Sequence, residues 1–194
     1  MRPVEQANYG MIRGSADWPA SNDVSAGSFM GRIRARVRLP GFDLPTEAQW
    51  EYACRAGEPG PYNVAGNPYD DTMMRYINNS GAAFAYPFPD RTADVDQGTA
   101  IVGSYDPNAW GLYDMHGNVF EWCLDWYGAF DATEENPPGA ASGVNRIRRG
   151  GSWTVGVENC RSAYRGQCFP SFNPPSYTGD DMGFRPVWPL PAKK

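Results

Sequence analysis

Residues 145–187 read NRIRRGGSWTVGVENCRSAYRGQCFPSFNPPSYTGDDMGFRPV, a segment with a compact motif at each end and an irregular interior. The first motif, RGGSW at residues 149–153, has paired glycines, which permit the positive φ values that a sharp strand-to-loop transition needs. The second motif, MGFR, closes the segment at residues 182–185. Prolines interrupt the interior, so it fits neither a regular helix nor a paired strand. We therefore predict a long loop with specified ends.

Aromatic residues in this loop indicate that it is functional rather than disordered. Long loops without secondary structure are uncommon inside compact domains, and those that occur are usually functional or disordered. The interior holds Tyr164, Phe169, Phe172 and Tyr177, whereas disordered segments are typically poor in aromatic residues. The loop is therefore the first candidate for a functional surface.

The composition predicts one globular domain with much irregular backbone. The chain has 194 residues, of which 41% are hydrophobic and 20% charged, and this suits a single domain over residues 1–194. Its 22 Gly and 18 Pro favour loops, while 7 Trp and 11 Tyr supply large side chains that can pin them. No apolar run approaches the roughly 18 residues that span a bilayer, and residues 1–10 lack the apolar core of a signal peptide. We expect a soluble chain with no membrane partner, in a compartment that the composition does not fix.

The net charge of −5 argues against a nucleic-acid-binding protein, which normally presents a basic face to phosphates. The one basic cluster in the sequence consists of Arg32, Arg34, Arg36 and Arg38. We interpret it as the solvated face of a helix, with a surface for a partner as the alternative.

An amphipathic helix is predicted after Ser25, which can serve as its N-cap. Phe29, Ile33 and Val37 recur every four residues and so share one face of this helix. Before it we expect coil, apart from a short strand at residues 11–12.

The clearest helix is predicted within residues 44–57, LPTEAQWEYACRAG. Thr46 can cap its N-terminus, and Gln49 three residues later completes a capping box. Trp50 and Cys54 lie four residues apart on one face, so we expect both side chains to point into the core.

The four cysteines, Cys54, Cys123, Cys160 and Cys168, are widely separated. They include no CxxC pair, which excludes a zinc knuckle or a thioredoxin motif. The spacing allows a buried disulfide with leftover thiols and does not settle the redox state.

Residues 110–128, WGLYDMHGNVFEWCLDWYG, combine hydrophobic core positions with oxygen donors. Asp114 and Glu121 offer carboxylates, and Gly117 and Val119 between them offer backbone carbonyls. Hard cations prefer such oxygen ligands, so these four residues form a candidate oxygen cage for Ca²⁺.

Five motifs then occur in the order typical of one known family: LPTEAQWEYACRAG, GLYDMHGNVFEWCLDWYG, RRGGSW, NCRSAYR and GFR. Over residues 44–187 the chain resembles the formylglycine-generating-enzyme (sulfatase-modifying factor) family. The resemblance implies an α+β, C-type lectin-like fold with little regular secondary structure, a small antiparallel sheet, a few helices and long loops. The strands that usually open this fold have no clear counterpart here, so we expect an N-terminally reduced domain.

The resemblance also implies a structural calcium ion and a disulfide. The family's calcium ligands fall on the four oxygen-cage positions named above. The disulfide that joins the WEY-x-C and C-x-x-x-R motifs would pair Cys54 with Cys160.

The family's copper chemistry does not carry over to this chain. Generating enzymes bind Cu(I) through two cysteines between the GGS motif and the later structural cysteine, whereas residues 153–159 here read WTVGVEN. Copper(I) needs soft thiolate ligands, so we expect no copper. Cys123 and Cys168 lie outside that interval, and His116 is the sole histidine, too few for the histidine trio of the fold's iron enzymes. We favour a protein that is not an enzyme, with a formylglycine-generating oxidase or a related enzyme as the alternative.

The chain resembles more closely a non-catalytic branch of the family, the variable proteins of diversity-generating retroelements. In that branch the variable region begins after RGGSW, keeps CRSA and a following Arg, and closes with GFR. Residues 149–185 follow this order. Diversification by a retroelement and a plain binding or accessory domain of the family are both compatible with the sequence.

We accordingly predict a ligand- or protein-binding module that displays residues 153–182 as a variable loop surface, with a protein or other macromolecule as its partner. Tyr and Phe give rigid contact area and small polar residues give adaptable hydrogen bonds, the mix found in antibody paratopes. The predicted contact residues are Trp153, Thr154, Val155, Gly156, Val157, Tyr164, Gly166, Gln167, Phe169, Ser171, Phe172, Asn173 and Tyr177.

Overall fold

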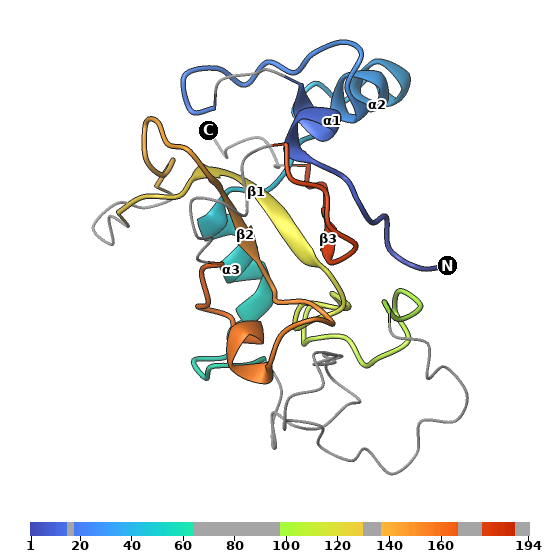
Figure 1. The fold of residues 1–194 in the computed structure, drawn as a ribbon, viewed down its shortest axis with the longest axis vertical. Helices are drawn as coiled ribbons and strands as arrows, with labels where there is room; N and C mark the ends of the chain where they lie inside the picture. The colour runs from blue at the N-terminus through green and yellow to red at the C-terminus, as the bar shows by residue number, and fades with distance from the viewer. Residues whose placement is uncertain (15–17, 64–97, 130–136, 167–175, 189–194) are drawn as a thin grey trace.

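The computed structural model describes residues 1–14, 18–63, 98–129, 137–166 and 176–188. Figure 1 shows few regular elements joined by long loops. The elements are α1 (Tyr9–Arg13), α2 (Phe29–Val37), α3 (Glu47–Arg55), β1 (Phe120–Trp126), β2 (Arg146–Arg149), the short 3₁₀ helix η1 (Val157–Cys160) and β3 (Met182–Gly183).

The three strands form one sheet in the order β2-β1-β3. β1 pairs antiparallel with β2 and parallel with β3, so the sheet is mixed, and the expectation of an antiparallel sheet was wrong for β3. Glu121 on β1 lies opposite Arg149 on one side and Gly183 on the other. The RGGSW and GFR motifs therefore meet on the same central strand.

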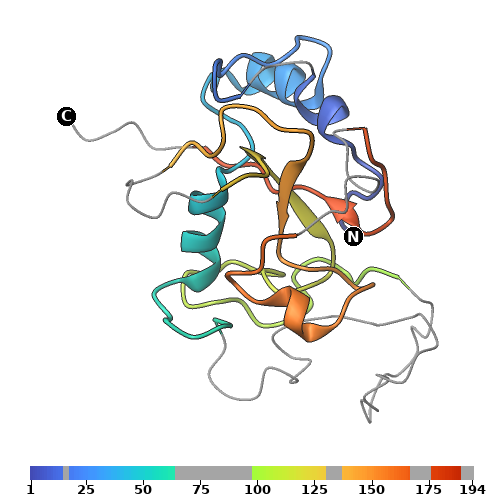
Figure 2. The ribbon, with the colours of Figure 1, turned by 60° about the vertical axis from the view of Figure 1, so that its left-hand side comes forward.

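Helix α3 has the capping box that its sequence predicts. The Thr46 hydroxyl accepts a hydrogen bond from the Gln49 N–H at 3.2 Å, and the Gln49 side chain accepts one from the Thr46 N–H at 3.0 Å. Trp50 and Cys54 are buried together with Cys123 of β1, as predicted. Figures 1 and 2 both show α3 lying along the sheet on the side of β2.

Helix α2 begins later than its sequence suggests. Ser28, not Ser25, is its N-cap, because the Ser28 hydroxyl accepts a hydrogen bond from the Gly31 N–H at 3.1 Å. Phe29 packs edge-on against Phe184, with ring centroids 5.0 Å apart. Val37 at the far end is 44% exposed, so the apolar face that was predicted is buried only over its first turns.

The predicted strand at residues 11–12 is instead part of helix α1. The Asn8 side chain accepts a hydrogen bond from the Met11 N–H at 2.7 Å and so caps this helix. Tyr9 and Ile12, three residues apart, bury against Trp122 of β1 in the larger core cluster. A local cap and a tertiary contact thus decide the structure of a segment too short to show a period.

Helices α1 and α2 lie at one end of the molecule and η1 lies at the other, as Figures 1 and 2 both show. The sheet separates these two ends. None of the helices in the described residues is long and apolar enough to cross a membrane.

Candidate functional site

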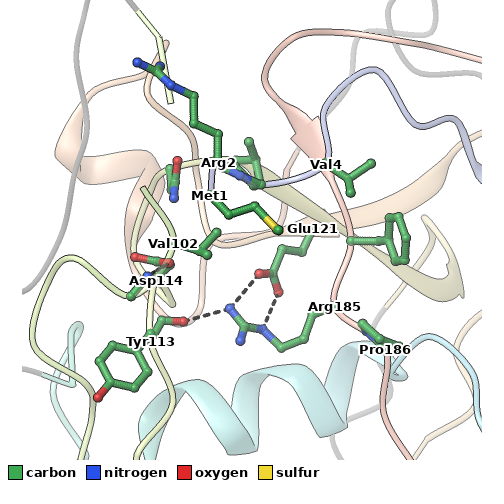
Figure 3. Close-up of a pocket in the computed structure, with 14 residues that line it drawn as sticks. Met1, Arg2, Val4, Val102, Tyr113, Asp114, Glu121, Arg185 and Pro186 are labelled. Carbon is green, nitrogen blue, oxygen red and sulfur yellow. Dashed lines mark hydrogen bonds and ion pairs between the residues drawn. The ribbon is translucent and has the colours of Figure 1, made fainter. Parts of the chain in front are cut away.

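Glu121 on β1 is the point at which three of the sequence motifs meet (Figure 3). Its carboxylate accepts a hydrogen bond from the Trp50 indole N–H of α3 at 2.7 Å. Arg185 of the GFR motif donates to both carboxylate oxygens, at 2.8 and 3.0 Å. Arg185 also donates to the Tyr113 carbonyl at 2.8 Å, so this largely buried ion pair ties α3, the sheet and residues 110–119 together.

A pocket of about 490 Å³ opens beside this ion pair. Figure 3 shows Asp114, Tyr113 and Val102 on one side of it and Met1 above the Glu121 and Arg185 pair. Three of the four oxygen-cage residues line the pocket, namely Asp114, Val119 and Glu121. The fourth, Gly117, lies in the same turn, where its N–H donates to the Gly150 carbonyl at 2.7 Å.

The carboxylate of Asp114 is half-buried, and its surroundings disfavour its charged form. Burial raises the pKa of its carboxyl, and the nearby charge of Glu121 raises it further, against the opposing effects of the Gly103 N–H and Arg185. Among the residues that the structure describes, Asp114 forms no ion pair, whereas Glu121 is held by Arg185. A cation here would relieve the cost of the buried charge, so the donors present fit a hard ion such as Ca²⁺.

The described residues contain no group of three or more His, Cys, Asp or Glu side chains that could hold a metal ion. A calcium ion beside Asp114 and Glu121 would therefore need backbone carbonyls as further ligands. Val119 and Gly117 were predicted to supply them. The calcium site remains a prediction.

The RGGSW turn has the backbone geometry that its paired glycines predict. Gly150 and Gly151 have φ values of 92° and 74°, in the region that favours glycine. A Cβ on Gly151 would lie 2.9 Å from the Cys160 Cα and would also meet the Cys160 sulfur. The turn therefore packs directly against the end of η1.

The structure distributes the predicted contact residues over three environments. Buried among them are Trp153, Val157 and Gly166. Half-buried are Thr154, Val155, Gly156, Tyr164 and Tyr177. Outside the described residues lie Gln167, Phe169, Ser171, Phe172 and Asn173. The half-buried members are partly accessible, although Val155, Tyr164 and Tyr177 also pack against the hydrophobic core.

Both ends of the 153–182 segment converge on Asp181. The Thr154 hydroxyl lies 3.4 Å from one Asp181 carboxylate oxygen, and the Tyr177 hydroxyl lies 3.4 Å from the other. The Trp153 indole N–H donates to the Asp180 carbonyl at 3.3 Å. The segment thus starts and ends at one place on the sheet.

A second ion-pair network, which sequence reasoning missed, fixes the middle of the segment. Arg165 donates to both oxygens of Glu47 on α3, at 2.6 and 2.9 Å. Arg149 on β2 is fully buried, pairs with Glu51 and also lies 3.6 Å from Glu47. These residues lie in separate motifs that are far apart in the chain, so no local spacing indicated which of them pair.

The disulfide between Cys54 and Cys160 is not formed in the structure, and both residues are buried free thiols. The Cys54 sulfur is directed at the Ser162 hydroxyl, 3.5 Å away, and the Cys160 sulfur at the Gly156 carbonyl, 3.8 Å away. Burial raises the pKa of Cys54 to about 12 and also raises that of Cys160. Neither thiol is therefore ionised near neutral pH.

His116 is buried and forms hydrogen bonds to two segments outside its own motif, at Asn63 and at Cys160. Its Nδ1 lies 2.7 Å from the Cys160 carbonyl, and its Nε2 accepts a hydrogen bond from the Asn63 N–H at 3.0 Å. A carbonyl can only accept, so Nδ1 carries the proton and the ring is neutral. Burial lowers the pKa of His116 to about 4.

Acidification is expected to weaken the hydrogen bonds that neutral His116 makes, and so to lower the stability of the domain. The unfolded pKa of histidine is about 6.5, so the neutral ring contributes its full stabilisation above that pH and loses it as the pH falls to about 4. The loss amounts to about 3 kcal/mol. Urea denaturation of the wild type and of His116→Gln should show their stability difference shrinking by this order between pH 7 and pH 4.

The contribution of Asp125 to stability depends on pH in the opposite direction to that of His116. The wild type must therefore be compared with the variant rather than measured alone. Burial raises the pKa of Asp125 to about 7, so its contribution to stability is lost as the pH rises towards 7. Both proteins carry Asp125, and its effect cancels in their difference. A stability difference that is the same at pH 7 and pH 4 would contradict a neutral His116.

The fold is an α+β scaffold of the C-type lectin-like class, in which the RGGSW and GFR motifs meet on the central strand β1. Residues 4–190 match the family model described as the sulfatase-modifying factor enzyme 1-like domain. The chain belongs to this family.

Three similar proteins are all longer than this chain. The formylglycine-generating enzyme of Mus musculus is 39% identical over 145 residues, which cover 73% of this chain and 38% of that enzyme. The serine/threonine-protein kinase pkn1 of Chlamydia pneumoniae is 37% identical over 148 residues, 73% of this chain and 20% of the kinase. The solved structure of Treponema denticola variable protein 1 matches with a TM-score of 0.59 and 32% identity, over 76% of this chain and 48% of that one. The chain thus spans less than half the length of each of these relatives.

Proposed function

We propose that this domain is a non-catalytic recognition module that binds a protein partner through the 153–182 loop surface. The observation that carries this proposal is the convergence of both ends of the segment on Asp181, above a network of buried ion pairs. Loops on a rigid scaffold are the usual place for binding residues. The likeness to Treponema denticola variable protein 1 supports the same role.

Two observations, on residues 153–159 and on three of the four cysteines, argue against copper-dependent oxidation. Residues 153–159, where the family's enzymes hold their copper-binding cysteines, contain none. Cys54, Cys123 and Cys160 are buried, and burial raises the pKa of each thiol. A Cu(I) site needs accessible thiolates, which these three do not offer.

A display experiment tests the binding role. One library would randomise Thr154, Val155, Tyr164 and Tyr177, and a control library would randomise the exposed residues Ser142 and Val144 outside the segment. We expect specific binders to a panel of proteins only from the first library. Alanine at Tyr164 or Tyr177 of a selected binder should weaken affinity by about tenfold or more, as for central interface aromatics.

The enzymatic alternative predicts a different result. A peptide with a Cys-x-Pro-x-Arg core, incubated with the domain and copper, should be oxidised at its cysteine if the domain is a generating enzyme. Turnover in this assay, or equal yields of binders from the two libraries, would overturn the proposal. Diversification by a retroelement has its own test, because a near-copy of the DNA encoding residues 153–185 that differs at adenines should lie beside a reverse transcriptase gene.

We also propose that Asp114 and Glu121, with the carbonyls of Gly117 and Val119, hold a structural calcium ion that fixes the base of the loop. The half-buried Asp114 carboxylate, which has no ion pair among the described residues, supports this assignment. When bound, the ion would supply the positive charge that this carboxylate lacks.

Calcium is expected to stabilise the domain measurably. A ligand at 100 times its Kd adds about 2.7 kcal/mol to folding stability, so 1 mM CaCl₂ should raise the Tm and EDTA should reverse the rise. Asp114→Asn should abolish the effect, whereas Asp106→Asn, which removes the same charge from an exposed position in the preceding loop, should keep it. An unchanged Tm of the wild type with and without calcium would rule out the site.

A further inference from the structure

The basic cluster of the sequence includes an arginine that is only partly neutralised. Asp43 receives Arg13 through Nε at 2.8 Å and Nη2 at 2.9 Å, and it receives Arg34 of α2 through Nη2 at 2.8 Å. The side chains of Arg13, Arg34 and Asp43 are 0%, 15% and 8% exposed. Two guanidinium groups therefore share one carboxylate in a largely desolvated place, and the cluster carries one excess positive charge.

The other hydrogen-bond partners of this cluster do not balance the charge. Asp23 lies next to Arg13, but it is its backbone carbonyl that accepts the hydrogen bond, at 3.3 Å. Arg34 otherwise donates to the carbonyls of Phe42 and Asn22, at 2.7 and 2.9 Å. Three of the five N–H groups of its guanidinium are thus used, and two are left for a ligand.

A cavity of about 420 Å³ opens onto this cluster, and residues of α2, of α3 and of the segment between these helices line it. Arg34 and Asp43 line the cavity together with the apolar residues Trp18 and Leu124 and the amide-bearing residues Asn22 and Gln49. A charged group with free donors, aromatic and aliphatic walls and a few polar groups are the usual components of a site for a small organic group.

We propose that this cavity binds a carboxylate carried on an apolar body, with Arg34 as its charged contact. The planar guanidinium fork matches a carboxylate, and a single excess positive charge matches a single negative one. The carboxylate can belong to an acidic side chain of a partner protein or to a free carboxylic acid. This site is separate from the 153–182 loops and does not rest on their function.

Arg36 and Arg38 distinguish these two sources. Arg36 lies on α2 and Arg38 is the C-cap of this helix; both are exposed, and neither forms an ion pair or a side-chain hydrogen bond with another described residue. A free carboxylic acid inside the cavity would not reach them. An acidic peptide that places one side chain in the cavity would bring further carboxylates towards them.

The test uses sodium benzoate and an acetylated hexaglutamate peptide as probes, with benzamide and hexaglutamine as uncharged controls. Binding would be followed in the ¹⁵N-labelled domain through the Trp18 indole N–H and the Arg34 Nε–H signals. We expect a saturable shift of both signals with at least one charged probe and none with its control. Arg34→Gln should weaken that binding by about tenfold or more, since hydrogen bonds to charged groups contribute roughly 1.5–3 kcal/mol.

The matched control variant is Arg36→Gln, which removes the same charge from the solvent side of the same helix. It should leave benzoate affinity within about twofold, because exposed charges contribute little. A loss of hexaglutamate affinity in Arg36→Gln that is measurable but clearly smaller than the tenfold loss in Arg34→Gln identifies a protein partner as the source. Unchanged benzoate binding in Arg36→Gln without hexaglutamate binding identifies a free acid.

Arg34→Gln is expected to fold, because Arg13 alone still contacts both oxygens of Asp43. If it does not, Arg34→Lys keeps the charge while it removes the fork, and it should weaken benzoate or peptide binding by several-fold. No saturable shift with either probe, or equal losses in Arg34→Gln and Arg36→Gln, would show that the cavity has no carboxylate site.

Discussion

Glu121→Ala is expected to lower the free energy of unfolding by about 3–5 kcal/mol, the cost of leaving one partner of a buried ion pair without the other. The change leaves Arg185 without the carboxylate that it contacts at two oxygens, and it removes the acceptor of the Trp50 indole N–H. Arg185 retains partial exposure, which places the expected loss at the lower end of this range for the ion pair itself. The lost Trp50 hydrogen bond adds to it.

Urea denaturation at pH 7 would measure this loss. Glu58→Ala is the matched control, because Glu58 is exposed just beyond α3 and its removal should change stability by less than about 0.5 kcal/mol. Glu121→Gln should fall between the two, since the amide can still accept from Trp50. If Glu121→Ala and Glu58→Ala were equally stable, the central role of Glu121 would be refuted.

Gly151→Ala should cost about 3 kcal/mol and should also displace the start of the loop surface. A left-handed backbone costs a non-glycine residue roughly 1–2 kcal/mol, and Gly151 has a φ of 74°. The added methyl would also lie 2.9 Å from the Cys160 Cα and 3.0 Å from the Asn159 carbonyl oxygen. Backbone cannot yield as a flexible side chain does, and such overpacking adds typically 1–3 kcal/mol.

Gly57→Ala separates the two contributions. Gly57 has a similar φ of 93°, but a Cβ there would meet nothing within 4 Å, so this variant reports the backbone cost alone. Gly151→Ala should therefore be less stable than Gly57→Ala by about 1–3 kcal/mol. It should also lose binding by selected loop variants that Gly57→Ala retains. Equal stability of the two would mean that η1 moves freely away from the turn.

The elements that sequence predicted well are those with local causes. Thr46 and Gln49 cap α3 through contacts only three residues apart, and the glycines of the RGGSW turn require positive φ in any context. Helix α1 and strand β3 were missed or misjudged because five and two residues show no period. Their structure depends on packing against β1, which no local pattern encodes.

The residues of the candidate site likewise divide into those predicted from a local motif and those whose contacts depend on the fold. Asp114 and Glu121 were predicted as partners because they share one short motif, and they line one pocket. Arg185 in the same pocket was recognised as a motif residue, but its bond to Glu121 spans 64 positions along the chain. The pairing of Arg165 with Glu47 spans 118. Contacts of this length follow from the fold and become visible only with it.

Arg165 and Arg185 also bear on how the loop surface can evolve. Both arginines find their carboxylates on scaffold elements, Glu47 on α3 and Glu121 on β1, rather than within the segment between them. Replacement of residues 167–176, which lie between the two arginines and precede β3, leaves each ion pair with both of its partners. Different sequences in this stretch are therefore compatible with the same two ion pairs, and selection for folding acts mainly on positions outside it.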